Sequence, residues 1–462
     1  MELFTGTIAA IATAAGAAGV AIIRISGSEA LKIATRVVKS RRIITDVPRG
    51  CFFYAEFVDP ETGESIDNGV VLIFRGPGSF TGEDVVELQG HGGDVVSGRL
   101  LEAVFAAGAT PAAAGEFTRR AFLNGRLDLT QAEAVIDLIQ AQTARAARAA
   151  HEQAQGALRH HIERLYNELI VICADIEAML DFDEGELPES FLDNAHIALT
   201  SITAKMSKLC QTRAEGALLR KGLLVVIAGK VNAGKSSLLN AMLEMPRAIV
   251  TSVPGTTRDT IEESFSFKGI PLRLTDTAGI RNAPGEAEQA GVARTQQVLQ
   301  VADIILYVVD GTAEVDQFDR DMLRTLPPQR TILLINKSDH SDFNGSLAQK
   351  LVDQTTTTLA TAECNTLSSE GLSGLFKSLD NIIKTISGSE NQGVTVSERH
   401  YQELNIALTA LNEAQLNLAT SLTMVIAAAS LRQGAEALGR ITGRVYSNDL
   451  LDTIFSRFCV GK

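Results

Sequence analysis

The sequence predicts a multidomain protein: an α+β N-terminal domain, a discontinuous α-helical bundle, and an α/β phosphate-loop domain inserted into that bundle. Three observations lead to this fold class. The chain of 462 residues is too long for one hydrophobic core, because a domain typically holds about 100 to 200 residues. A phosphate-loop motif lies near its middle. Segments with helical spacing of apolar residues flank that motif on both sides.

Composition restricts the class of protein. With 45% hydrophobic and 21% charged residues, the chain is globular rather than disordered. The net charge of -13 opposes nonspecific binding to nucleic acid, so an RNA contact would need a local basic patch. The cysteines are far apart and form no Cys-x-x-Cys pair, which indicates free thiols in a reducing cytoplasm and no zinc module: Cys51, Cys173, Cys210, Cys364 and Cys459.

An apolar segment at residues 7–23 lies where a signal peptide would. It is preceded by Glu2 instead of positive charge and is interrupted by Gly16 and Gly19, so it is expected to be folded. No other apolar run approaches the roughly 18 residues of a membrane span. We therefore expect a cytoplasmic protein without a membrane contact.

Residues 1–118 predict the α+β domain. Short runs rich in β-branched or aromatic residues predict strands at 20–25, 51–58 and 70–74. Helical spacing occurs at 30–38 and 95–107. The dinucleotide spacing G-x-G-x-x-G is absent, so Gly-His-Gly-Gly at 90–93 is interpreted as a turn that needs positive φ angles.

Residues 119–220 predict the first part of a helical bundle. They are rich in Ala, Leu, Glu, Gln and Arg, with apolar residues at helical intervals. The same character returns at 388–462, whereas 221–387 alternates strand and helix patterns. The economical topology is a nucleotide-binding domain inserted into a helical domain. A row of three unrelated domains is the alternative.

The inserted segment is organised around Gly-Lys-Val-Asn-Ala-Gly-Lys-Ser at 229–236, which fits the phosphate-loop spacing G-x-x-x-x-G-K-[ST]. A strand pattern precedes it and a helix pattern follows, so backbone N–H groups at a helix N-terminus would bind a polyphosphate. Lys235 would reach the β- and γ-phosphates, and Ser236 would bind Mg²⁺. A glycine-rich turn that binds nothing is the alternative.

Two later segments are candidate switch loops. Thr257 follows Pro254 and Gly255 in a loop, where it would close on Mg²⁺ when a γ-phosphate is present. Asp276 ends a predicted strand near the metal, and Gly279 would approach the γ-phosphate. Their order along the chain is that of a GTPase.

Two further segments would read the base. Asn-Lys-Ser-Asp at 336–339 follows a buried strand pattern, and the Asp339 carboxylate would accept hydrogen bonds from two guanine donors that adenine lacks. Lys337 would lie along the base, and residues 367–370 would complete the pocket. The predicted nucleotide contacts are Asn232, Ala233, Gly234, Lys235, Ser236, Ser237, Thr251, Ser252, Val253, Pro254, Gly255, Thr256, Thr257, Asp276, Thr277, Ala278, Gly279, Asn336, Lys337, Asp339, Ser368, Ser369 and Glu370.

The catalytic water needs an unusual partner. Ile280 follows Asp-Thr-Ala-Gly, where Ras-like enzymes place a glutamine, and isoleucine cannot orient water. Glu286 and Glu288 lie close by and are candidates. Asn232 offers an amide oxygen suited to a monovalent cation, which would supply charge in place of an arginine finger. An amide that only stabilises the loop is the alternative for Asn232.

Further sequence blocks lie outside the nucleotide motifs: Gly19-Val20 with Arg24-Ile25-Ser26-Gly27, Ser79-Phe80-Thr81-Gly82-Glu83-Asp84, Glu87-Leu88-Gln89-Gly90-His91-Gly92-Gly93, Gly115-Glu116-Phe117-Thr118 and Phe458-Cys459-Val460-Gly461-Lys462. With these blocks the chain resembles the MnmE (TrmE) family of bacterial tRNA-modification GTPases over essentially its full length.

This resemblance implies a set of ligands and roles. The N-terminal domain would dimerise and bind a tetrahydrofolate derivative, in its 5,10-methylene or 5-formyl form, through Arg24, Glu87, Arg126 and Lys462. The family usually has lysine at the position of Arg126, so charge is kept but contact geometry differs. Ser236 and Thr257 would bind Mg²⁺, and Glu288 would handle the hydrolytic water. Potassium would be bound by Asn232, Thr251, Val253 and Thr256.

The resemblance also implies a function. The family modifies C5 of the wobble uridine in certain tRNAs, adding a carboxymethylaminomethyl or aminomethyl group jointly with the flavoprotein MnmG, whose FAD is the only flavin involved. Cys459 is either a core residue or part of the chemistry. A rival hypothesis is a regulatory GTP switch in ribosome or RNA assembly. That switch would be expected to carry a basic RNA-binding appendage.

Overall fold

The computed structural model describes residues 6–40, 44–48, 50–180, 189–244, 263–276, 297–355, 359–368, 370–387, 394–418 and 421–462. The chain divides into two compact units. The first unit consists of Met1–Ile136, Gln153–Asp181 and Ala428–Lys462. The second consists of Asp137–Glu152 and Phe182–Ala427.

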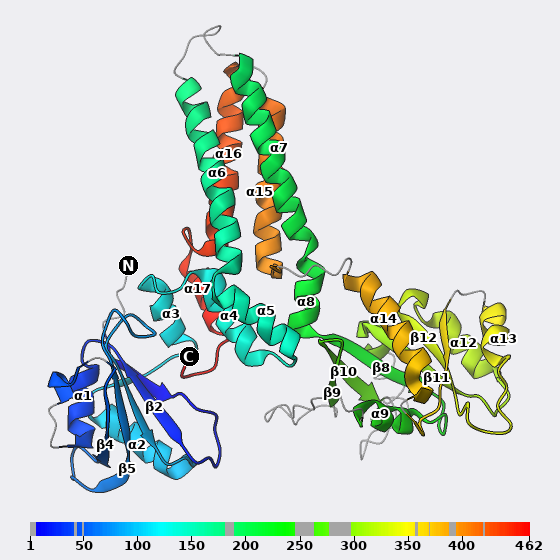
Figure 1. The fold of residues 1–462 in the computed structure, drawn as a ribbon, viewed down its shortest axis with the longest axis horizontal. Helices are drawn as coiled ribbons and strands as arrows, with labels where there is room; N and C mark the ends of the chain where they lie inside the picture. Colours follow the sequence, from blue (N-terminus) through cyan, green and yellow to red (C-terminus); the bar gives the residue numbers. More distant parts are fainter. Residues whose placement is uncertain are drawn as a thin grey trace. The chain divides into compact units, whose positions relative to one another are not determined.

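A seven-stranded sheet forms the N-terminal part of the first unit, in the order β3-β4-β5-β6-β2-β1-β7. Its strands are β1 (Ile8–Ile11), β2 (Ala21–Ser26), β3 (Val38–Lys39), β4 (Phe52–Val58), β5 (Ser65–Phe74), β6 (Val85–Gly90) and β7 (Thr110–Pro111). Helices α1 (Ala30–Val37) and α2 (Asp94–Ala106) share one hydrophobic core with the sheet (Figure 1). Since side chains alternate along a strand, Ile23 and Ile25 enter this core while Arg24 faces away from it.

The predicted strands and helices of residues 1–118 are confirmed, but the interpretation of the glycines at 90–93 is partly wrong. Only Gly93 has a positive φ, of 120°. A Cβ on Gly90 would lie 2.5 Å from Oδ2 of Asp67, and one on Gly92 would lie 2.2 Å from the carbonyl oxygen of Ala18. These two glycines are therefore required by close contacts rather than by backbone conformation.

Helices complete the first unit: α3 (Glu116–Leu123), α4 (Leu129–Gln140), α6 (Ala157–Met179), α16 (Ser421–Thr442) and α17 (Asn448–Phe455), of which α4 and α16 continue into the second unit. A small core unites Phe122 and Leu129 with Leu451 and Phe455. Residues 122–132 and the C-terminal helix α17 thus share one core. In the part of the chain that the structure describes, no helix combines the length and apolar character needed to cross a membrane.

The second unit contains helices from both sides of the nucleotide-binding segment: α5 (Ala144–Ala154), α7 (Glu189–Gln211) and α8 (Arg213–Lys221) before it, and α15 (Glu398–Asn417) after it. Helix α7 packs along α15 (Figure 1). Arg213 forms an ion pair of 2.7 Å with Glu398 and lies 4.3 Å from the ring centre of Tyr401. Helices that precede the nucleotide-binding segment in the sequence therefore pack against a helix that follows it.

A six-stranded sheet, in the order β13-β12-β11-β8-β10-β9, forms the rest of the second unit. Its strands are β8 (Leu223–Gly229), β9 (Glu263–Phe267), β10 (Ile270–Asp276), β11 (Ile304–Asp310), β12 (Thr331–Asn336) and β13 (Ala360–Glu363), all parallel except β9. Helices α9 (Lys235–Leu243) and α14 (Ser373–Ser387) pack into one core with the sheet, and α12 (Gln317–Thr325) and α13 (Leu347–Thr355) into another. Loops at the carboxyl ends of such a sheet are where ligands bind.

Candidate functional site

The phosphate loop joins the end of β8 to the start of α9, as the sequence predicted. Gly229 and Gly234 have φ angles of 140° and 94°, which only glycine adopts readily. A Cβ on Gly229 would lie 2.2 Å from the carbonyl oxygen of Val308, and one on Gly234 would lie 2.1 Å from Nδ2 of Asn336. At these two positions the loop therefore has space only for backbone, and the first N–H groups of α9 are available to bind a phosphate.

Lys235 lies inside this loop. Its side chain is buried, and Nζ donates a hydrogen bond of 2.6 Å to the carbonyl oxygen of Lys230. Asn232 has a φ of 67°, an uncommon conformation for a residue other than glycine. The loop is thus a fixed, curved structure whose lysine ammonium is held at its inner side.

The base-reading segment begins where β12 ends. Nδ2 of Asn336 donates a hydrogen bond of 2.9 Å to the carbonyl oxygen of Ala233, which joins this segment to the phosphate loop. Lys337 has a φ of 65°, and its Nζ lies 2.5 Å from Oδ2 of Asp310. Burial alone would raise the pKa of Asp310, but hydrogen bonds from Lys337 and Thr312 outweigh it and lower that pKa.

A third loop, after β13, lies against the base-reading segment. The N–H of Ser338 donates to the carbonyl oxygen of Cys364 at 3.1 Å, and Nδ2 of Asn365 lies 3.5 Å from Oγ of Ser338. The same loop carries Ser368 and Glu370. Asn365 was not predicted to have a role; its position one residue after the Cys364 contact is a tertiary feature that no local motif reveals. Asp339 is exposed beside this loop, where a base can reach it.

The structure thus brings together the predicted contacts in the phosphate loop with Asn336 and Lys337. Asp276 ends β10, where its backbone is paired with Ile227 of β8. Several predicted residues lie outside the described residues: Thr251, Ser252, Val253, Pro254, Gly255, Thr256, Thr257, Thr277, Ala278, Gly279, Ile280, Glu286, Glu288 and Ser369. The second magnesium ligand, three potassium ligands and both candidate water-binding carboxylates belong to this group.

A second candidate site lies on the face of the N-terminal sheet opposite the core that α1 and α2 share with it. Arg24 on β2 is directly opposite Glu87 on β6, and its Nε lies 2.9 Å from Oε1 of Glu87. Nη1 of Arg24 donates a hydrogen bond of 3.3 Å to the carbonyl oxygen of Gly461. Burial, together with the positive charge of Arg24, lowers the pKa of Lys462. Three of the four predicted folate contacts therefore form one cluster.

The C-terminal segment is held firmly enough to place Lys462 there. The N–H of Gly115 donates to the carbonyl oxygen of Cys459 at 3.4 Å, and Val460 forms an antiparallel bridge with Ala114. Gly461 has a φ of 100°, and a Cβ on it would lie 2.3 Å from the carbonyl oxygen of Ile11. Cys459 is exposed, which excludes the alternative of a core residue.

Two aromatic rings flank Arg24. Its guanidinium carbon lies 5.9 Å from the ring centre of Phe80 and 5.6 Å from that of Phe117, within range of cation–π attraction. Phe80 is partly exposed, whereas Phe117 is fully buried. The fourth predicted folate contact, Arg126, lies near the loop that carries Phe80, since a Cβ on Gly82 would be 3.3 Å from its Cγ.

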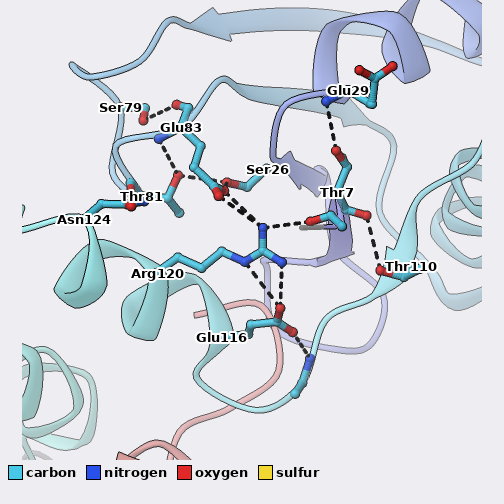
Figure 2. Close-up of polar contacts among 12 residues, drawn as sticks. Thr7, Ser26, Glu29, Ser79, Thr81, Glu83, Thr110, Glu116, Arg120 and Asn124 are labelled. Atoms are coloured by element: carbon cyan, nitrogen blue, oxygen red, sulfur yellow. Dashed lines mark hydrogen bonds and ion pairs between the residues drawn. The ribbon is translucent and has the colours of Figure 1, made fainter. Parts of the chain in front are cut away.

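The Phe80 loop is anchored by a buried ionic network (Figure 2). Arg120 on α3 is 3% exposed and pairs with Glu83 of that loop at 3.2 Å and with Glu116 at 2.8 Å. Oγ of Ser26 donates to Glu83 at 2.7 Å, and Nδ2 of Asn124 donates to the carbonyl oxygen of Thr81 at 2.7 Å (Figure 2). Such buried charges are tolerated only when paired. Glu83 and Glu116 belong to the sequence blocks at 79–84 and 115–118, but no local pattern predicted that they pair with Arg120.

Comparison with known proteins identifies the family of the chain. Residues 7–126 match the family model described as GTP-binding protein TrmE N-terminus, and residues 129–459 match that of the MnmE helical domain. The tRNA modification GTPase MnmE of Geobacter sulfurreducens is 42% identical over 458 residues, which cover 99% of both chains. That of Symbiobacterium thermophilum is 41% identical over 463 residues, again covering 99% of each.

Among solved structures, the G domain of the T. maritima FeoB iron transporter is 23% identical and covers 36% of this chain and 98% of its own, with a TM-score of 0.26. At that score the likeness adds nothing to the assignment. The matches to the family models and to full-length relatives decide it. The chain belongs to the MnmE family of tRNA modification GTPases, and is a GTP hydrolase that acts in tRNA modification with guanine nucleotide and Mg²⁺.

Proposed function

We propose that the protein is a potassium-activated GTP hydrolase that works with the flavoprotein MnmG to modify C5 of the wobble uridine of certain tRNAs. A tetrahydrofolate derivative would supply the one-carbon unit of a carboxymethylaminomethyl or aminomethyl group. The observation that best supports this proposal is the cluster of Arg24, Glu87 and Lys462. This cluster requires both ends of the chain and is separate from the phosphate loop, so it provides for a second ligand.

The chemistry of this cluster suits a folate. A pterin ring presents an amine and a neighbouring ring N–H, and the carboxylate of Glu87 is an acceptor for such a pair. Arg24 holds this carboxylate in place through their ion pair of 2.9 Å, and Lys462 is a second cation beside it. The half-exposed ring of Phe80 offers a flat apolar surface for the pterin, and Arg126, near the same loop, adds a further cation.

At the nucleotide site, the chain's own groups would act in the following way. The ammonium of Lys235 leaves the carbonyl oxygen of Lys230 and binds the β- and γ-phosphates. Ser236 and Thr257 would hold Mg²⁺, which would supply positive charge to the phosphates. Glu288 positions the attacking water. The potassium ligands would be Asn232, Thr251, Val253 and Thr256.

We further propose the assignment of residues 1–118 as the dimerisation and folate-binding domain and 221–387 as the GTPase domain. Residues 119–220 and 388–462 would form the two parts of the helical domain. The active species would be a cytoplasmic homodimer that binds MnmG and tRNA, with FAD present only in MnmG.

Mass spectrometry of tRNA nucleosides tests this function. A strain that lacks the gene should lose the modified wobble uridine, and the wild-type gene should restore it. Arg24→Met should fail to restore it although the variant hydrolyses GTP normally, because the folate cluster and the phosphate loop belong to different units of the chain. Unchanged nucleosides in the deletion strain would refute the proposal.

A further inference from the structure

The phosphate loop is connected to helix α12 through a side chain to which the GTPase motif assigns no role. Nζ of Lys230, the second residue of the motif, lies 2.5 Å from Oδ2 of Asp316 and 2.7 Å from Oδ2 of Asp319. Asp316 is the N-cap of α12, and its side chain accepts a hydrogen bond of 3.2 Å from the N–H of Asp319. Lys230 therefore joins the phosphate loop to the first turn of α12.

Asp319 is itself fixed to the sheet. It is 2% exposed, and its Oδ1 accepts a hydrogen bond of 2.9 Å from the hydroxyl of Tyr307, a fully buried residue of β11. Burial and the charge of Asp319 raise the pKa of Tyr307, so this hydroxyl remains a donor at every physiological pH. The phenol donor and the ammonium partner offset the desolvation free energy of this buried carboxylate. Loss of either partner would leave much of that free-energy cost without compensation.

The backbone of Lys230 points the other way, into the nucleotide site. Its carbonyl oxygen is the group that accepts the hydrogen bond from Nζ of Lys235 at 2.6 Å. One residue thus joins the buried Tyr307–Asp319 pair to the lysine that binds phosphates. Burial alone would lower the pKa of Lys230, but Asp316 and Asp319 outweigh it and raise that pKa, so the ammonium stays charged.

We propose that Lys230 is a positioning residue of the phosphate loop: its ion pairs with Asp316 and Asp319 hold the first half of the loop in the shape that receives the nucleotide phosphates. The need for such an anchor follows from the loop itself, which has glycines at both ends and the uncommon conformation of Asn232 between them. An ordinary exposed ion pair would contribute little, but Asp319 is buried and rigid.

The base-reading segment has a separate anchor, the pair between Lys337 and Asp310. Loss of the Lys230 anchor should therefore weaken binding of the phosphates without changing recognition of guanine. The ratio of affinities for GTP and inosine triphosphate measures base recognition, because the two nucleotides differ only in the 2-amino group.

The test compares three variants in steady-state hydrolysis, nucleotide binding and thermal unfolding. Lys230→Met keeps the aliphatic chain and removes the charge; Lys230→Arg restores a charge. Arg324→Met is the matched control, since Arg324 forms an exposed pair of 3.3 Å with Asp321 on the same helix, away from the loop. We expect Lys230→Met to lower kcat/KM for GTP and the affinity for GDP by about 10- to 100-fold, the scale of misplaced catalytic geometry. The GTP-to-inosine-triphosphate ratio should not change.

Lys230→Arg should recover most of that loss, and Arg324→Met should resemble the wild type. Wild-type kinetics for Lys230→Met would overturn the proposal. So would equal losses in Lys230→Met and Arg324→Met accompanied by equal decreases in melting temperature, because the pair would then serve only general stability.

Discussion

At the residue scale, Asp339 is the group that should distinguish guanine from other bases. It is exposed beside Ser338, within the loops that meet after β12 and β13. Asp339→Asn replaces an acceptor with an amide that cannot receive both guanine donors, and each unpaired group costs about 1 to 3 kcal/mol. We expect GTP affinity to fall by roughly 10- to 1000-fold and xanthosine triphosphate to bind in its place.

Titration with fluorescent nucleotides measures this change. Asp342→Asn is the control, because Asp342 is exposed in the same region and lies near His340 rather than near Ser338. If Asp339→Asn binds GTP as tightly as the wild type does, residues 336–339 do not read the base.

Ile280 stands where Ras-like enzymes have the glutamine that orients the attacking water, and Glu288 is predicted to take over that role. Loss of a group that orients the attacking water typically reduces the rate by about 10² to 10⁴. Glu288→Ala should lie in this range in single-turnover hydrolysis, with GTP affinity preserved. Glu286→Ala is the matched neighbour and should be nearly normal; the reverse pattern would assign the role to Glu286.

At the element scale, the C-terminal segment completes the N-terminal site. Gly461→Ala would place a methyl group 2.3 Å from the carbonyl oxygen of Ile11 at a φ of 100°, so the segment must move and take Lys462 away from Arg24. We expect binding of 5-formyltetrahydrofolate, measured by calorimetry, to weaken by about 10-fold or more, the loss of roughly one charge-assisted hydrogen bond.

Hydrolysis of GTP by Gly461→Ala should not change, since Gly461 lies in the first unit and the phosphate loop in the second. Val460→Ala is the control: its side chain is exposed, and its bridge to Ala114 is made by backbone. Undiminished folate binding by Gly461→Ala would show that Lys462 is not part of the site.

The elements with strong local signals could be predicted from the sequence. Strands β8 and β12 are continuous apolar runs because both faces of the parallel sheet are covered, and each was predicted directly before its nucleotide-binding motif. Strands such as β9 and β13 are short edge strands with polar residues, and they were missed. Edge strands need less burial, so they carry little pattern.

The candidate sites show the same division between local and tertiary information. The phosphate loop is local, and its residues were predicted. The anchors are not: Arg120 meets Glu83 across 37 positions, and Lys230 meets Asp319 only through the register of β8 and β11. The folate contacts came from a resemblance, and the structure explains why residues so distant in sequence as Arg24 and Lys462 belong together.

At the scale of the whole molecule, the nucleotide-binding sheet is attached to helices within its own unit. The turn between β9 and β10 is the point of attachment: Oγ1 of Thr143 donates a hydrogen bond of 2.7 Å to the carbonyl oxygen of Gly269. Close by, Arg145 of α5 forms an ion pair with Glu215 of α8, and Lys268 pairs with Asp380 at 2.7 Å. The sheet is therefore joined to the segment before α5 at the start of β10, the opposite end of that strand from Asp276.

We propose that hydrolysis in this protein serves tRNA chemistry, with potassium as the activating ion. A cage of amide and carbonyl oxygens that includes Asn232 would discriminate between ions by size.

The most direct test is a reconstitution of the purified protein with MnmG, tRNA, GTP and a tetrahydrofolate labelled in its one-carbon unit, followed by mass spectrometry of the tRNA nucleosides. We expect a wobble uridine that carries the label at C5 in potassium, and little hydrolysis or label in sodium. Asn232→Ala should abolish the difference between the two salts by lowering the rate in potassium. Full GTP hydrolysis with no labelled uridine, or equal labelling in sodium and potassium, would refute the proposed function.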